Sequence, residues 1–235
     1  YMISTKLTIV IPCKNEGNTI YACLLAISNQ VDSNNLSIII ADSSDNQESL
    51  DILAKCKSDF KNLAIQIVDG GFPAQARLTG SHLVQTEYLL FLDADIMLTD
   101  INTLVQSIIY CCANPHIDLL TIPFYTDSKW NWAFRAFEFF QKIGPPFAIG
   151  GFQLWKTSTY WGVGGYDPSE IFAEDYSISS KVSRANFKML RPHLAYTSPR
   201  RFENKGIFYM FKLMILSYIN RNNPEFFKKH HDYWT

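Results

Sequence analysis

Apolar residues gather in four short runs over the first hundred positions, and each run is followed by polar residues. These runs span residues 7–12, 36–41, 63–68 and 87–92. They are too short for typical helices and are rich in β-branched and aromatic side chains, so they predict buried strands. The segments between them have helical patterns, at residues 18–28, 47–57 and 73–84. Asn18 is the expected N-cap of the first helix, and Pro73 suits the first turn of the third.

Strands that alternate with helices in this way form a mostly parallel sheet with helices on both faces. Ligands on such sheets bind beyond the carboxyl ends of the strands. Polar clusters fall at those ends, at residues 12–17, 42–46 and 93–95. We therefore expect an α/β fold in which these three loops converge on one crevice.

The pattern loosens after residue 95. The sequence predicts helices at 100–114, 130–141 and 174–185, strands at 117–125, 152–156 and 194–198, a loop at 166–173, and an apolar helix from 206. We expect one domain, with a nucleotide-binding half at 1–98, an acceptor and catalytic-base half at 99–205, and a C-terminal apolar helix at 206–235.

Composition narrows the range of partners. The chain of 235 residues has a formal net charge of −1, which gives no electrostatic reason to expect nucleic acid. Its five cysteines show no Cys-x-x-Cys spacing, which favours a reducing compartment. Residues 1–6 are polar and lead directly into a strand, so we expect no signal peptide and a cytoplasmic location.

Asp93-Ala94-Asp95 carries the sharpest chemical signal. Residues two apart in a strand face the same side, so both carboxylates can lean over one point at the strand's end. Hard oxygen ligands of this kind suit Mg²⁺ or Mn²⁺ together with substrate phosphates. A solvated turn is the alternative for the pair. His193 is a candidate further ligand, although an ordinary half-buried histidine also fits.

Two other charged residues belong to the expected crevice. Asp42 ends the second strand, where it could accept hydrogen bonds from a base or ribose, or start an Asx-turn. Arg77 lies among small residues of the third helix. Its guanidinium could pair with a diphosphate or hold Asp93 in place, and a surface arginine is the alternative.

Charged pairs also occur in the second half. Glu174 and Asp175 open a helix, where acidic residues are favoured by the dipole, and one of them could act as a general base. The residues alone do not decide which. Arg200 and Arg201 follow a predicted strand, where they could clamp phosphates or remain a solvated pair.

Together these segments resemble the inverting nucleotide-sugar glycosyltransferases of family two, which have the GT-A fold. The resemblance runs from Thr8 to about Phe202. It rests on five segments in the family's order, at residues 10–16, 41–44, 76–80, 91–95 and 150–175.

The resemblance implies a role for each matched residue. Contacts to the nucleotide sugar are implied for Pro12, Asn15, Glu16, Asp42, Arg77, Asp93, Ala94, Arg200 and Arg201. Gly150 and Gly151 fall on the acceptor and sugar side. Asp95 would ligate the metal with Asp93, and Asp175 would be the catalytic base, with Glu174 beside it. The implied reaction is in-line displacement from a nucleotide diphosphate sugar, with a UDP-sugar favoured.

The stretch Arg200-Arg201-Phe202 departs from the Gln-x-x-Arg-Trp motif of processive members, which favours transfer of a single sugar to a hydroxyl acceptor. A retaining transferase of the same fold and an Asp-x-Asp phosphatase or phosphotransferase are the alternatives. Residues 130–140 and 207–218 are apolar or aromatic enough to rest on the inner face of a membrane as well as in a core. On that reading the acceptor is lipid-linked. A membrane-spanning segment beyond Thr235 is left open.

Overall fold

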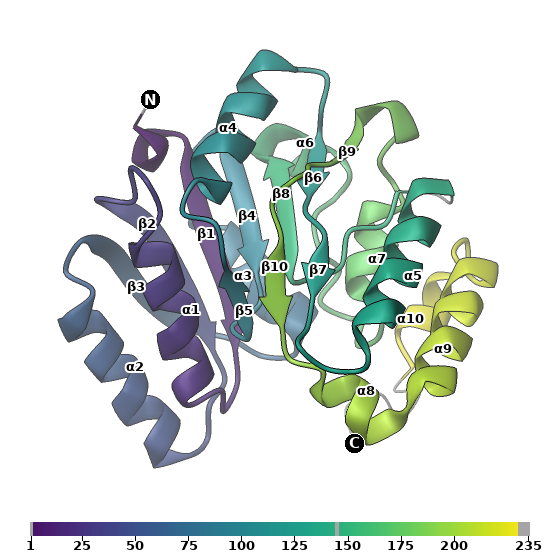
Figure 1. Ribbon diagram of the computed structural model, residues 1–235, viewed down its shortest axis with the longest axis horizontal. Coiled ribbons are helices and arrows are strands. Elements are labelled where there is room, and N and C mark those ends of the chain that lie inside the picture. The colour runs from purple at the N-terminus through teal and green to yellow at the C-terminus, as the bar shows by residue number, and fades with distance from the viewer. Residues whose placement is uncertain (1, 144–145, 230–235) are drawn as a thin grey trace.

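The computed structural model describes residues 2–143 and 146–229, which fold around a seven-stranded sheet of order β3-β2-β1-β4-β8-β6-β9 (Figure 1). Its strands are β1 (Leu7–Cys13), β2 (Leu36–Asp42), β3 (Leu63–Asp69), β4 (Tyr88–Leu92), β6 (Leu119–Thr121), β8 (Phe152–Lys156) and β9 (Phe187–Met189). A second, three-stranded sheet contains β5 (Ile96–Leu98), β10 (Ala195–Thr197) and β7 (Phe124–Tyr125). This α/β architecture confirms the predicted fold class.

The first four strands are parallel, as the alternating pattern predicts. They are connected by α1 (Asn18–Ser28), α2 (Gln47–Asp59) and α3 (Pro73–Ser81). Helices α1 and α2 lie on one face of the sheet and α3 on the other (Figure 1). Ile9 and Ile11 therefore pack into one core while Val10 packs into the other. A Cβ atom at Gly80 would lie 2.4 Å from Val10, so this glycine lets α3 pack closely on the sheet.

Some predicted boundaries are wrong by a few residues. The N-cap of α1 is Gly17 rather than Asn18, and no side chain caps the helix. Helix α3 ends at Ser81, three residues before the predicted end. Helix α2 has a side-chain cap, because the Asn46 side chain accepts a hydrogen bond from the Ser49 N–H at 2.8 Å.

The second half departs further from the prediction. The single strand expected at 117–125 is divided between β6 and β7, which belong to different sheets. Strand β8 is antiparallel to both of its neighbours, β4 and β6. Elements that the sequence did not predict include β5, β9 and the helix α6 (Thr157–Gly162). The predicted helix at 174–185 is shorter, as α7 (Glu174–Ser179).

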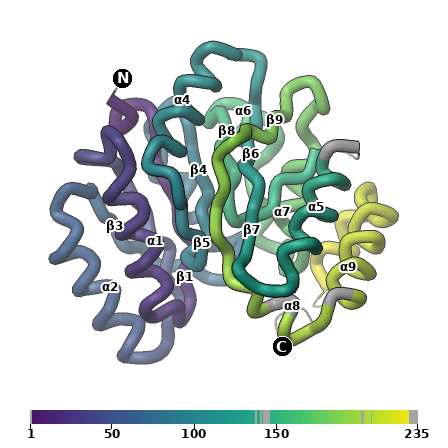
Figure 2. The backbone as a smooth tube through the Cα atoms, viewed as in Figure 1, coloured from purple at the N-terminus to yellow at the C-terminus, as the bar shows by residue number. Residues whose placement is uncertain are grey.

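The remaining helices are α4 (Thr103–Ala113), α5 (Asn131–Ile143), α8 (Arg200–Lys205), α9 (Ile207–Ile219) and α10 (Pro224–Phe227), with 3-10 turns at Ile3–Thr5 and Arg184–Asn186. Figure 2 follows the chain from β10 through α8 into α9, which lies at the same end of the molecule as α5. These two helices supply walls of one cavity. Among the described residues, no helix is long and apolar enough to cross a membrane.

Candidate active site

A cavity of about 730 Å³ lies at the carboxyl ends of β1, β2 and β4. All three polar loops predicted to converge there contribute to its wall. Its polar lining residues include Lys14, Glu16, Ser43, Arg77, Asp93, Asp95, Glu174, Asp175, Arg200, Asn204 and Lys205. Because these residues come from six parts of the chain, the crevice exists only in the folded molecule.

The Asp-Ala-Asp segment lies in the turn between β4 and β5. Both carboxylate residues border the cavity, and Ala94 also lines it. The turn is closed by a hydrogen bond from the Ile96 N–H to the Asp93 carbonyl at 3.1 Å. The two residues therefore share the cavity as predicted, although they lie in a turn rather than on an extended strand.

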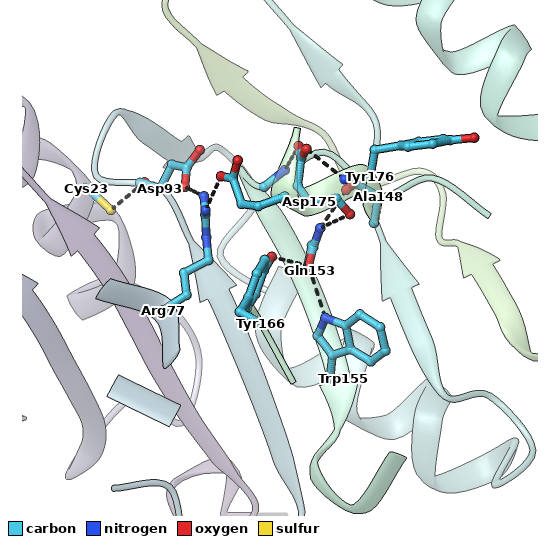
Figure 3. A network of polar contacts seen from close by, with 11 residues as sticks. Cys23, Arg77, Asp93, Ala148, Gln153, Trp155, Tyr166, Asp175 and Tyr176 are labelled. Carbon is cyan, nitrogen blue, oxygen red and sulfur yellow. Dashed lines mark hydrogen bonds and ion pairs between the residues drawn. The ribbon is translucent and has the colours of Figure 1, made fainter. Parts of the chain in front are cut away.

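Arg77 is buried and lies between two carboxylates (Figure 3). Its Nη2 contacts Asp93 Oδ1 at 2.6 Å, and its Nη1 contacts Glu174 Oε1 at 2.7 Å. Burial alone would lower the pKa of the guanidinium, but Asp93 raises that pKa above its usual range, so Arg77 stays charged. Of the two roles considered for Arg77, the structure supports holding Asp93.

Asp175 follows Glu174 at the start of α7 and borders the cavity. Its Oδ2 accepts a hydrogen bond from the Gly150 N–H at 2.9 Å, and its Oδ1 accepts one from the Tyr176 N–H at 2.8 Å. Burial, followed by the charge of Glu174, raises the pKa of Asp175 to about 6. A Cβ atom at position 150 would lie 2.6 Å from Arg77 Nη2, so the missing side chain of Gly150 leaves room for the guanidinium in its observed position.

A buried polar residue that the sequence reasoning missed supports this arrangement. The side chain of Gln153 donates to the carbonyl of Ala148 at 2.6 Å and accepts from the hydroxyl of Tyr166 at 2.8 Å and the indole of Trp155 at 3.1 Å (Figure 3). Its amide also lies 3.4 Å from the Asp175 carbonyl. A glutamine inside an otherwise apolar strand was the signal that could have identified it.

Two residues expected to touch the nucleotide also fix the loops. Asp42 Oδ1 accepts hydrogen bonds from the N–H and the hydroxyl of Ser44, at 3.2 and 2.7 Å, which is the Asx-turn alternative. The Asn15 amide donates to Asp45 at 2.9 Å and tethers the loop after β1 to the loop after β2. Ser43 borders the cavity in place of Asp42, while Pro12 and Glu16 line it as predicted.

Of the remaining candidate residues, Arg200 lies at the cavity and His193 does not. Arg200 borders the cavity, with Nη2 at 3.5 Å from Glu16 Oε1. The side chain of Arg201 lies outside the described residues. The assignment of His193 as a metal ligand is corrected, because its ring nitrogens contact Asp100 at 3.0 Å and Gln106 at 2.8 Å. The antiparallel pairing of β5 with β10 explains this, since it aligns Ala195 with Leu98 and so carries residue 193 away from the acidic turn.

A second cavity, of about 160 Å³, opens beside the first. Asp93, Asp95, Asp175 and Arg200 border both cavities. The walls of the second cavity are otherwise mostly apolar, and Gly151 lies among them. The acidic residues therefore stand at the junction of a polar and an apolar space.

The strand order β3-β2-β1-β4, with helices on both faces, defines an α/β protein of the doubly wound type. The family model described as "Glycosyl transferase family 2" matches residues 8–164. The chain belongs to glycosyl transferase family 2, and its fold is GT-A.

Known relatives agree with this placement. A curated poly(ribitol-phosphate) beta-glucosyltransferase of Bacillus spizizenii is 33% identical over 93 residues, covering 38% of this chain and 15% of the relative. The mannosyltransferase PcManGT from Pyrobaculum calidifontis, solved with GDP-Man and Mn²⁺, has a TM-score of 0.73 at 15% identity, over 95% of this chain and 64% of that one. S. aureus TarS 1-349 with UDP-GlcNAc has a TM-score of 0.62 at 17% identity, over 97% and 69% of the two chains.

Proposed function

We propose that this protein transfers one glycosyl group from a nucleoside diphosphate sugar to a hydroxyl acceptor, with a divalent cation and with inversion at the anomeric carbon. The observation that carries the proposal is that Asp175 and the acidic turn border both the large polar cavity and the smaller apolar one. A donor on one side and an acceptor on the other would meet at these carboxylates. The family match favours this reading over the phosphatase alternative.

The polar cavity suits the donor. Pro12 and Glu16 on one side and Arg200 and Lys205 on the other provide a mixed polar and cationic lining for a nucleotide and its diphosphate. The comparison proteins were solved with GDP-Man and with UDP-GlcNAc, which supports a nucleotide sugar as donor here. We favour a UDP-sugar, because the TarS structures and the sequence resemblance agree on that class.

The donor set also fits a divalent cation. Asp95 and Asp93 offer carboxylate oxygens at the cavity, and two such ligands are typical of Mg²⁺ or Mn²⁺ sites completed by substrate phosphates. Bound there, the cation would neutralise charge on the leaving diphosphate. Arg77 already occupies Asp93 Oδ1, so Asp95 is the principal protein ligand in this proposal.

Asp175 is the proposed general base. Glu174 is held by the Arg77 guanidinium, whereas Asp175 accepts hydrogen bonds from two backbone N–H groups and borders both cavities. A base in this position would take the acceptor hydroxyl proton as that oxygen attacks the anomeric carbon in line. The α or β configuration of the product, read by proton NMR, tests inversion against the retaining alternative.

We further propose that the protein works at the cytoplasmic face of a membrane. Large apolar side chains are exposed on α5 and α9, among them Trp132, Phe139, Phe208 and Ile219. Such a face suits the boundary between headgroups and acyl chains. Phe208→Glu with Ile219→Glu should reduce flotation with anionic liposomes, while Leu50→Glu on the distant helix α2 should not. Equal flotation of all three proteins would refute this contact.

The donor proposal is tested by a thermal-shift screen of UDP, GDP, dTDP and CMP, each with and without Mn²⁺. A ligand that binds only the folded state raises Tm. At a hundredfold excess over Kd it adds about 2.7 kcal/mol to the free energy of unfolding. We expect UDP to give the largest shift, and we expect Asp95→Ala to remove the part that depends on Mn²⁺. A shift that is the same in Asp95→Ala would place the cation elsewhere.

A further inference from the structure

The smaller cavity beside Asp175 has walls unlike those of the donor cavity. Aromatic side chains enter from four separate segments, and helix α9 adds three apolar residues along one face. These residues are Phe124, Phe134, Phe147, Phe172, Met210, Leu213 and Met214. A cavity of about 160 Å³ with such walls is comparable to apolar cavities of roughly 150 Å³ that take up benzene rather than water.

The charged groups of this cavity gather at its junction with the donor cavity, where Asp93, Asp95, Asp175 and Arg200 border both spaces. On helix α9, the Ser217 hydroxyl donates to the Leu213 carbonyl of its own helix at 2.9 Å. Tyr176 is 7% exposed, and its hydroxyl is a buried atom. The cavity therefore has charged groups at one end and mostly apolar walls beyond them, which is typical of a site for an amphipathic ligand.

The cavity is continuous with the catalytic residues. Because Asp175 and Asp95 border it, a molecule seated there lies next to the proposed base. A general base must lie within hydrogen-bond distance of the hydroxyl that it deprotonates. The portion of the acceptor attached to the reacting alcohol would then occupy the apolar space. A fully hydroxylated sugar would have to bury its hydroxyl groups against phenyl rings and thioethers, where they find few partners.

We propose that this cavity is an acceptor subsite for alcohols that carry a hydrocarbon or aromatic group, and that it selects such amphipathic acceptors over wholly polar ones. This inference rests on the proposed transfer reaction and specifies its acceptor class. Helix α9 contributes through its inner face, with Met210 and Met214 one turn apart. The flexible thioethers allow the cavity to adapt to chains of different shape.

The test uses methyl, butyl, hexyl and octyl glucosides below their micelle concentrations as probes. Their Kd values are measured by calorimetry on the full chain, with UDP and Mn²⁺ and again without them. Each methylene that enters an apolar site tightens binding about fourfold, so affinity should rise along the series and level off once the cavity is full. Sugar transfer to the same compounds should follow the same order in kcat/KM.

Met214→Gln keeps the side chain's length and places an amide on the cavity wall. The ratio of the Kd of methyl glucoside to that of hexyl glucoside should therefore be at least about tenfold smaller than in the wild type. Ile215→Gln is the matched control, because the neighbouring residue is exposed on the outer face of the same helix and should bind the series as the wild type does. Met210→Gln repeats the test on the inner face if Met214→Gln does not fold.

Three results would overturn the inference: equal affinity along the series for the wild type, an unchanged dependence in both inner-face variants, or a loss confined to Ile215→Gln, which would place the alkyl chain on the outer surface. Failure of UDP to bind would instead refute the donor assignment. The titrations without UDP would still report on the apolar cavity, so the two failures are distinguishable.

Discussion

The two cavities that meet at Asp175 are built from different parts of the fold and have opposite chemistry. The larger is lined by loops that follow parallel strands, and it contains charged groups such as Glu16, Arg77 and Lys205. The smaller is lined by rings and thioethers from α5, α9 and the segments around them. In the proposed reaction the charged space would hold the diphosphate and the apolar space would hold the acceptor, and the two meet at one short helix, α7.

The difference between the two cavities explains why the neighbouring carboxylates of Glu174 and Asp175 have different surroundings. Glu174 begins α7 on the donor side and is neutralised by the Arg77 guanidinium. Asp175, the next residue, borders the apolar side as well, and burial raises its pKa to about 6. The two adjacent carboxylates therefore have different surroundings, which is consistent with the proposal that Asp175, and not Glu174, is the base.

Replacing the base should have the largest effect. Asp175→Asn should lower kcat about 10²- to 10⁴-fold, the usual contribution of a positioned base, while UDP affinity changes little. The control is Asp45→Asn, in a loop outside both cavities, which should transfer normally. Full activity in Asp175→Asn would refute the assignment.

Replacing Arg77, whose guanidinium lies between Asp93 and Glu174, should have the next largest effect, and this effect is on stability. Arg77→Met leaves Asp93 and Glu174 without their shared partner, and breaking a buried pair of this kind typically costs about 3–5 kcal/mol. Lys6→Met is the matched control, because its partner Glu87 is 47% exposed and such a surface pair contributes about 0–1 kcal/mol. Urea unfolding of both variants measures the difference. Similar losses would mean that Arg77 does not hold the acidic residues together.

The raised pKa of Asp175 predicts two opposite pH trends. The transfer activity of the protein should rise about tenfold per pH unit up to about pH 6 and then level off, because the proposed base must be ionised. Stability should behave in reverse: a carboxyl whose pKa is raised by folding stabilises fully below its unfolded value of 3.8 and loses that contribution as pH rises through 6. The Tm of Asp175→Asn minus that of the wild type should therefore increase from pH 5 to pH 8. A difference that is constant with pH would contradict the shifted pKa.

The donor side of the molecule could be predicted from the sequence more closely than the apolar side. Strands β1 to β4 and their order of polar loops follow from local hydrophobic patterns, so the crevice and its acidic turn were predicted closely. The strand predicted at 194–198 is present as β10, but its pairing with β5 and β7 joins distant segments, and no local pattern encodes that pairing. His193 was misassigned for that reason, since only the antiparallel register of β10 on β5 shows that its end of the strand lies away from the acidic turn.

Side-chain partners were the other limit of the sequence reasoning. Asp42 and Asn15 carry groups able to bind a nucleotide, and only the folded loops show that Ser44 and Asp45 engage them. The apolar cavity was not predicted at all, because its walls come from residues between Phe124 and Ser217 that share no motif. Its helices were recognised as unusually apolar, which is the one sequence signal that pointed toward it.

The smallest predicted effect concerns the buried hydroxyl of Tyr176, a residue that lines the apolar cavity. Tyr176→Phe removes a buried O–H that has no partner among the described residues, so the free energy of unfolding should stay equal or rise by about 1 kcal/mol. Tyr166→Phe is the contrasting variant, because that hydroxyl donates to Gln153 Oε1 at 2.8 Å and its loss should cost about 1 kcal/mol. If both variants lost the same stability, the Tyr176 hydroxyl would have a partner in the protein.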